Sequence, residues 1–239
     1  MDELSLDLET VAAQAPSARR VPSDPWLARR ARRIGGSDVP AVLLAYDPRP
    51  DELAAAPRYV AEAAALTRTA RGEMPMVIAR KAGLRAPVRR SAMMGRGLAR
   101  EASLLRSWAR MTGTRVVLAS EMPPHARQPI DHDCAAVAVT LDAMAWDAID
   151  GWAPAEAKCT RDAYEAPTWY HRAQVQTQIA CALAVGAWLV VGPGWGASDD
   201  GGGEPVAWWI ERDDDEIARI RRAATKAAAQ LALAMTEEE

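Results

Sequence analysis

Residues 134–160, CAAVAVTLDAMAWDAIDGWAPAEAKCT, decide the fold of this 239-residue chain. They contain three short apolar runs, at 134–142, 143–149 and 152–160. Short apolar runs with β-branched and aromatic residues are typical of buried strands. We therefore expect neighbouring strands here, with a hairpin that folds the chain back on itself.

Two acidic residues and a lysine stand on these predicted strands. Asp142 ends the first run, and Glu156-Ala157-Lys158 follows fourteen residues later. Because side chains alternate along a strand, Glu156 and Lys158 point to one face, which a hairpin can bring beside Asp142. Two carboxylates at one point repel each other unless a cation lies between them, and such ligands suit Mg²⁺ or Mn²⁺. The Lys158 ammonium can then bind, orient or deprotonate an attacking water and offset charge on a phosphorane-like transition state.

The Glu-x-Lys pattern has a second interpretation. With three lysines and 32 acidic residues in the chain, an acid two positions before a lysine arises by chance about 0.4 times. The tripeptide alone therefore fits a salt-bridged edge strand as well as a reactive site.

The surrounding sequence predicts helices before and after this sheet. Residues 1–22 show no sustained period, so we expect a mobile tail, followed by a single domain over residues 23–239. The periodicity predicts helices at 23–33, 38–45, 51–66, 72–83, 95–113, 167–185 and 211–235, and further strands at 114–120, 187–192 and 206–211. The fold class is therefore α/β or α+β, with a helical N-terminal part and a small mixed sheet flanked by helices.

Composition excludes several classes of protein. No run approaches the roughly 18 apolar residues of a membrane span, and the acidic start lacks the features of a signal peptide. Three widely spaced cysteines argue against a disulfide framework or a four-cysteine metal site, and fit the cytoplasm.

Basic residues outnumber acidic ones by 12 over residues 16–115, and acidic residues exceed basic ones by 11 over residues 116–239. A surface that separates its charges in this way can bind a polyanion through its basic part. Helices with solvent-exposed charged faces would produce the same charge distribution without such binding.

Four sequence blocks carry a resemblance to a known family. They are Trp26, Arg30 and Ser37 at the turn Ile34-Gly35-Gly36-Ser37-Asp38; Gly97, Glu101 and Gly113 on a predicted helix; Thr140-Leu141-Asp142 leading to Glu156-x-Lys158-Cys159; and Tyr170-His171-x-Ala173-Gln174-Val175-Gln176. Together they resemble the PD-(D/E)xK nuclease core, and more narrowly the YqaJ-like viral recombinase family, which includes the lambda-type exonuclease. The similarity spans roughly residues 23–180. Leu141 and Ala143 depart from the family's usual Pro before the Asp and Gly after it.

The resemblance implies a role for each matched residue. It implies that Asp142, Glu156 and Glu101, with the backbone carbonyl of Ala157, hold Mg²⁺, for which Mn²⁺ can substitute, and that Lys158 contacts the nucleophilic water and the scissile phosphate. The residues implied to grip a 5′-terminal phosphate are Arg30, Ser37, Thr140 and Gln174. An Arg fork, hydroxyls and an amide are suitable partners for a dianion. Gln178 and His171 share the helix face of Gln174, so we expect both to line the same cleft.

The implied activity is a Mg²⁺-dependent 5′→3′ exonuclease on linear double-stranded DNA. It would resect ends to 3′ single-stranded tails for phage-type recombination, with a single-strand annealing protein as partner and a homotrimeric ring around the DNA. The sequence contains no base-reading motif, so we expect phosphate contacts and little sequence preference. Two alternatives stay open: a different PD-(D/E)xK enzyme, such as an endonuclease or a repair nuclease, and a catalytically inactive DNA-binding module.

Overall fold

The structure is a computed structural model that describes residues 33–86, 92–122, 130–131, 136–160, 165–193 and 204–235. The predicted tail and the predicted helix before residue 33 lie outside these ranges. The described helices are α3 (Val39–Tyr46), α4 (Pro50–Ala55), α5 (Arg58–Ala64), α6 (Met76–Lys81), α7 (Ala92–Thr112), α8 (Trp169–Ala182) and α9 (Asp214–Met235), with a short 3₁₀ turn η1 at Gly36–Asp38. None of them is both long enough and apolar enough to cross a bilayer.

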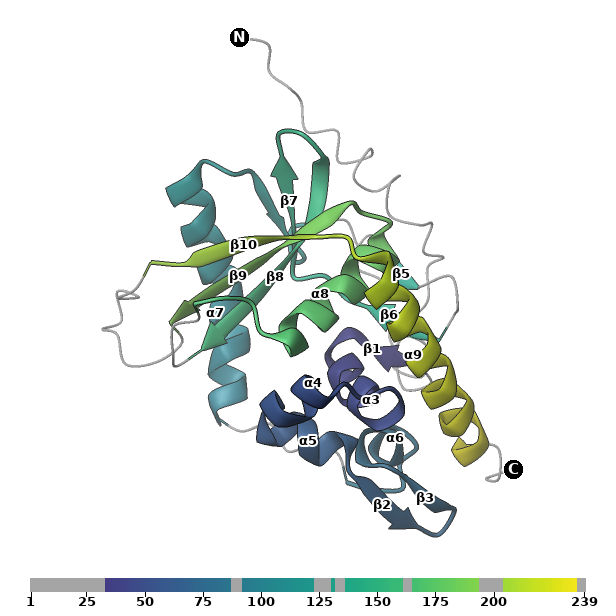
Figure 1. Cartoon of the computed structure of the whole chain (residues 1–239). Coiled ribbons are helices and arrows are strands. Elements are labelled where there is room, and N and C mark those ends of the chain that lie inside the picture. Colours follow the sequence, from purple (N-terminus) through teal and green to yellow (C-terminus); the bar gives the residue numbers. More distant parts are fainter. Residues whose placement is uncertain are drawn as a thin grey trace.

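A five-stranded sheet forms the centre of the molecule (Figure 1). Its strand order is β10-β9-β8-β7-β4, where β4 is Val116–Leu118, β7 is Ala143–Asp147, β8 is Gly151–Thr160, β9 is Gly186–Pro193 and β10 is Val206–Glu211. Only the central pair β8–β9 is parallel, and α8 supplies the crossover between these two strands. The small mixed sheet expected from the sequence is therefore confirmed.

Helices α7 and α8 cover opposite faces of this sheet (Figure 1). On β8, Ala155 and Ala157 pack with Leu105 and Trp108 of α7. The alternate positions Glu156 and Lys158 therefore face the other way, toward α8. Because two small alanines lie under α7, this helix can pack close to the strand that carries the Glu-x-Lys pattern.

Two smaller sheets lie outside the central one. In the first, β1 (Ile34–Gly35) pairs in parallel with β6 (Val137–Val139), and β6 pairs with β5 (Ile130–Asp131). The second is a hairpin of β2 (Leu66–Thr69) and β3 (Gly72–Pro75), whose second strand lies where the sequence predicted the start of a helix at 72–83. The Thr69 hydroxyl donates to the carbonyl of Gly72 and accepts from the Arg71 amide, and Gly72 adopts a φ of 95°. This local turn chemistry ends the helical pattern.

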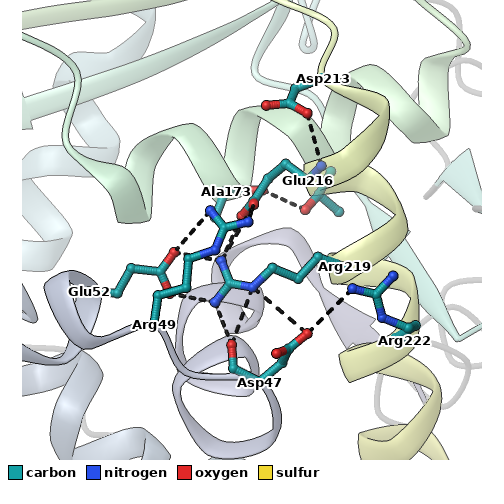
Figure 2. Close-up of polar contacts among 9 residues, drawn as sticks. Asp47, Arg49, Glu52, Ala173, Asp213, Glu216, Arg219 and Arg222 are labelled. Carbon is teal, nitrogen blue, oxygen red and sulfur yellow. Dashed lines mark hydrogen bonds and ion pairs between the residues drawn. The ribbon is translucent and has the colours of Figure 1, made fainter.

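The C-terminal helix α9 joins the N-terminal helices through buried charges. Figure 2 shows the Arg219 cluster, which consists of Asp47, Arg49, Glu52, Glu216, Arg219 and Arg222. The guanidinium of Arg219 is 3% exposed and donates to both oxygens of Glu52, which is 4% exposed, at 2.5 Å. It also donates to the backbone carbonyl of Asp47. The cluster thus ties α9 to the end of α3 and to α4.

Candidate active site

The predicted hairpin brings Asp142 to the Glu-x-Lys strand. Strands β7 and β8 pair antiparallel with Ala143 opposite Ala155, so Asp142, just before β7, lies at the level of Glu156. The backbone amide of Ala157 donates a hydrogen bond of 3.0 Å to Asp142 Oδ2. This bond fixes the carboxylate at the strand that carries Lys158.

Glu156 is the centre of the polar contacts. It is 2% exposed and accepts hydrogen bonds on both of its carboxylate oxygens. Lys158 Nζ and Gln174 Nε2 (2.5 Å) donate to Oε1, while Gln178 Nε2 donates to Oε2. Burial of an ionised carboxylate is tolerated only when such donors replace the lost water. The contact of Gln178 confirms the helix face predicted for it.

The carboxylates of the site repel one another. Burial, and then the neighbouring Glu156, raise the pKa of Asp142 well above its usual range, against the opposing influences of the Ala157 amide and Lys158. Burial also raises the pKa of Glu101, on α7, with a further rise from Glu156 and a lowering by Lys158. The charges of Glu156, Lys158 and Asp142 therefore act on Glu101 or are acted on by it.

Opposing influences act on the pKa of Lys158. Burial, the largest single influence, lowers it, but Glu156, Asp142 and Glu101 together raise the pKa above its usual range. Three carboxylates thus act on one ammonium at this site.

The chemistry of these donors fits a divalent ion. Three carboxylates and a backbone carbonyl are the hard oxygen ligands that Mg²⁺ prefers. Within the described ranges, however, no three His, Cys, Asp or Glu side chains are grouped so that they could hold a metal. Both oxygens of Glu156 are taken by side-chain donors. An ion would therefore require Glu156 to exchange at least one of these donors.

Three of the four residues predicted to grip a phosphate gather near the same end of the fold. Ser37 follows β1 and Thr140 follows β6, and the parallel pairing of these strands puts both exposed hydroxyl residues at one edge. A Cβ on Gly36 would meet Val139 at 3.1 Å and Gln174 at 3.7 Å, so a glycine lets the η1 turn approach α8 closely. Gln174 thus lies between this edge and Glu156. Arg30 lies outside the described residues.

Two further groups border the site. His171 is buried, and burial followed by the nearby Lys158 lowers its pKa to about 4, so the imidazole is neutral at physiological pH. Tyr59, on α5, was not among the residues predicted from the sequence, yet Lys158 influences the pKa of its hydroxyl. Its place depends on how α5 packs, and the local sequence carries no signal for that. A separate hollow of about 570 Å³, between Arg172 and the start of α9, is lined by none of the predicted site residues.

Comparison with solved structures supports this architecture. The chain is similar to the alkaline exonuclease LHK-Exo from Laribacter hongkongensis, in a crystal structure of that protein and in another of its complex with dAMP. Each alignment has a TM-score of 0.58 and 21% sequence identity, and covers 90% of this chain and 95% of the other. No protein-family model matches the sequence, and no curated protein matches it. At this identity the likeness establishes the fold, and the fold class expected from the sequence is confirmed.

Proposed function

We propose that this protein is a Mg²⁺-dependent exonuclease that degrades linear double-stranded DNA from the 5′ end. The observation that carries the proposal is that Asp142, Glu156 and Lys158 meet at β8, where the Ala157 amide donates to Asp142 and Lys158 Nζ donates to Glu156. The fold shared with an alkaline exonuclease supports a nuclease activity. One line of support is local side-chain geometry, and the other is the path of the whole backbone.

Asp142, Glu156, Glu101 and the carbonyl of Ala157 would hold the metal ion. The chemistry that Mg²⁺ supplies when bound is Lewis acidity toward the phosphate and a lower pKa for an attacking water. Of the roles open to Lys158, we assign the donor role: its ammonium would hydrogen-bond a phosphate oxygen and offset the charge that develops there.

Selection of a strand end would come from the phosphate-gripping residues. Ser37, Thr140 and Gln174, together with Arg30, offer hydroxyl, amide and guanidinium donors to a 5′-terminal phosphate. Hydrolysis that breaks the bond to the 3′-oxygen of the first nucleotide leaves a phosphate on the next 5′ end. Each cut would thus regenerate the group that these residues recognise.

The proposal extends to a cellular role. Resection of this kind leaves a 3′ single-stranded tail, which is the substrate of a single-strand annealing protein in phage-type recombination. A homotrimer around the duplex would keep the enzyme on its substrate between cuts, and the cytoplasm is the compartment in which such a substrate occurs. The basic residues of the N-terminal half would contact the DNA backbone, so affinity would fall steeply with salt.

The test compares three substrates of one sequence: linear duplex with 5′-phosphate, linear duplex with 5′-hydroxyl, and covalently closed circular duplex. Each is incubated with Mg²⁺ and with EDTA, and released mononucleotides are measured. We expect fastest release from the phosphorylated linear DNA, and none from the circle or in EDTA. Cutting of the circle would favour an endonuclease of the same fold. Binding without any cutting in Mg²⁺ would favour an inactive DNA-binding module.

A further inference from the structure

A row of aromatic rings leads from the surface toward the candidate active site. Tyr59 on α5 contacts Tyr170 at the start of α8, with ring centroids 6.2 Å apart and planes at 86°. Tyr170 in turn lies 5.9 Å from Trp169 and 4.3 Å from the ring of His171. One turn further along α8, Gln174 reaches Glu156. The row therefore ends beside the catalytic groups.

Tyr59 is open to solvent. The residue is 63% exposed, so its ring is accessible to a ligand although it contacts Tyr170. The side chain of Lys158 is 25% exposed. Both groups can therefore be reached from the surface of the protein.

Helix α8 connects the two groups. Tyr170, which contacts Tyr59, lies one turn before Gln174, and Gln174 and Lys158 both donate to Oε1 of Glu156. In contrast, the exposed Trp146 on β7 lies at the far end of the β7–β8 hairpin, opposite Trp152, and packs on that ring at 5.6 Å. Tyr59 is thus an exposed aromatic ring at the start of α8, one turn from the residue that contacts Glu156.

We propose that the ring of Tyr59, held edge-on by Tyr170, is a stacking surface for the nucleobase adjacent to the scissile phosphate. This inference rests on the proposed nuclease function. A base has an apolar π-face whatever its identity, so stacking positions a nucleotide without reading its sequence. That property suits an enzyme that must accept each successive nucleotide. The T-shaped contact with Tyr170 restrains the ring, and with 63% of Tyr59 exposed the ring remains accessible to a base.

The test is a cycle that combines a protein variant with a change in the substrate. Parent, Tyr59→Ala and Tyr59→Phe proteins are assayed on 5′-phosphorylated linear duplex, and on duplexes with an abasic site at the first or the second nucleotide. Base stacking is worth about 1–3 kcal/mol per base, so we expect Tyr59→Ala to lower kcat/KM roughly 5- to 150-fold on the normal duplex. On one of the two abasic substrates the parent and Tyr59→Ala should differ less than about 2-fold. Tyr59→Phe, which keeps the ring, should behave as the parent.

Trp146→Ala is the matched control, since it removes another exposed aromatic ring, and it should leave all rates within about 2-fold. The inference is overturned if Tyr59→Ala cleaves the normal duplex at the parental rate, or if its loss is the same on every substrate. A loss in Tyr59→Phe equal to that in Tyr59→Ala would assign the effect to the hydroxyl and also overturn it. Failure of the proposed function has a different signature, in which the parent itself releases no nucleotide from linear DNA.

Discussion

Among the described residues, charges gather both at Arg219 and at the candidate active site, and the two clusters differ in composition. The Arg219 cluster has three basic and three acidic residues; its central pair, Arg219 and Glu52, is closed to solvent, while Asp47, Arg49 and Arg222 at its edge are 41–64% exposed. In the candidate active site, three carboxylates act on the ammonium of Lys158, whose side chain is 25% exposed. A buried pair of opposite charges holds elements together, whereas carboxylates gathered at one point suit a cation. We therefore expect a structural role for the first cluster and chemistry at the second.

The largest effect expected from this contrast follows removal of the ammonium from the active site. Lys158→Ala should reduce nucleotide release from linear duplex by about 10³-fold or more, because the phosphate loses its positive partner in the transition state. DNA binding, measured by fluorescence anisotropy, should persist. Lys226→Ala, an exposed lysine on α9, is the control and should cut at the parental rate. A Lys158→Ala protein that still cuts at that rate would show that the ammonium has no part in the reaction.

A smaller effect, on stability, is expected from the balanced cluster. Arg219→Ala leaves the buried Glu52 with only the longer contact of 3.9 Å to the half-exposed Arg49, and should lower the free energy of unfolding by about 3–5 kcal/mol in urea denaturation. Replacing both partners with apolar residues, Arg219→Met with Glu52→Leu, should recover most of this loss. Arg58→Ala breaks an exposed pair with Glu62 and should cost less than about 1 kcal/mol. Equal losses from Arg219→Ala and Arg58→Ala would contradict the structural role of the buried cluster.

The smallest effect concerns pH and metal. Because the pKa values of Asp142 and Glu101 are raised in the folded state, that state binds protons more tightly than the unfolded chain. The contribution of these two carboxyls to the free energy of unfolding is fully present at pH values below the ordinary pKa of a carboxyl group. It is lost as the pH rises through their pKa values in the folded state. Saturating Mg²⁺ should offset this loss, raising the Tm by several degrees at pH 8 and by less at pH 5.

Calorimetry of the parent and two variants checks this prediction. Asp142→Asn should abolish the Mg²⁺-dependent rise, and Asp150→Asn, in the exposed hairpin turn, should retain it. If Mg²⁺ raises the Tm equally at both pH values, or still raises it in Asp142→Asn, then metal binding does not depend on these carboxylates.

The sequence predicted those parts of the molecule that local pattern controls. The alternation on β8 put Glu156 and Lys158 on one face, and the apolar runs predicted the strand pairing that carries Asp142 to them. The β2–β3 hairpin was missed because turn chemistry at Thr69 and Gly72 overrode a helical pattern. The position of Tyr59 could not be predicted, because it depends on how α5 packs against the rest of the chain. The burial of Arg219 could not be predicted either, because the sequence of its helix resembles that of an ordinary solvent-exposed helix.

The bond between Glu52 and Arg219 joins residues that are 167 positions apart. A ribosome makes Glu52 long before it makes Arg219, and during that interval the acid lacks the guanidinium that accompanies its burial in the native state. The helices of residues 39–55 cannot complete this contact until α9 has been made. Formation of the contact is then a late step of folding, and the first helices of the described chain depend on α9 to finish their packing.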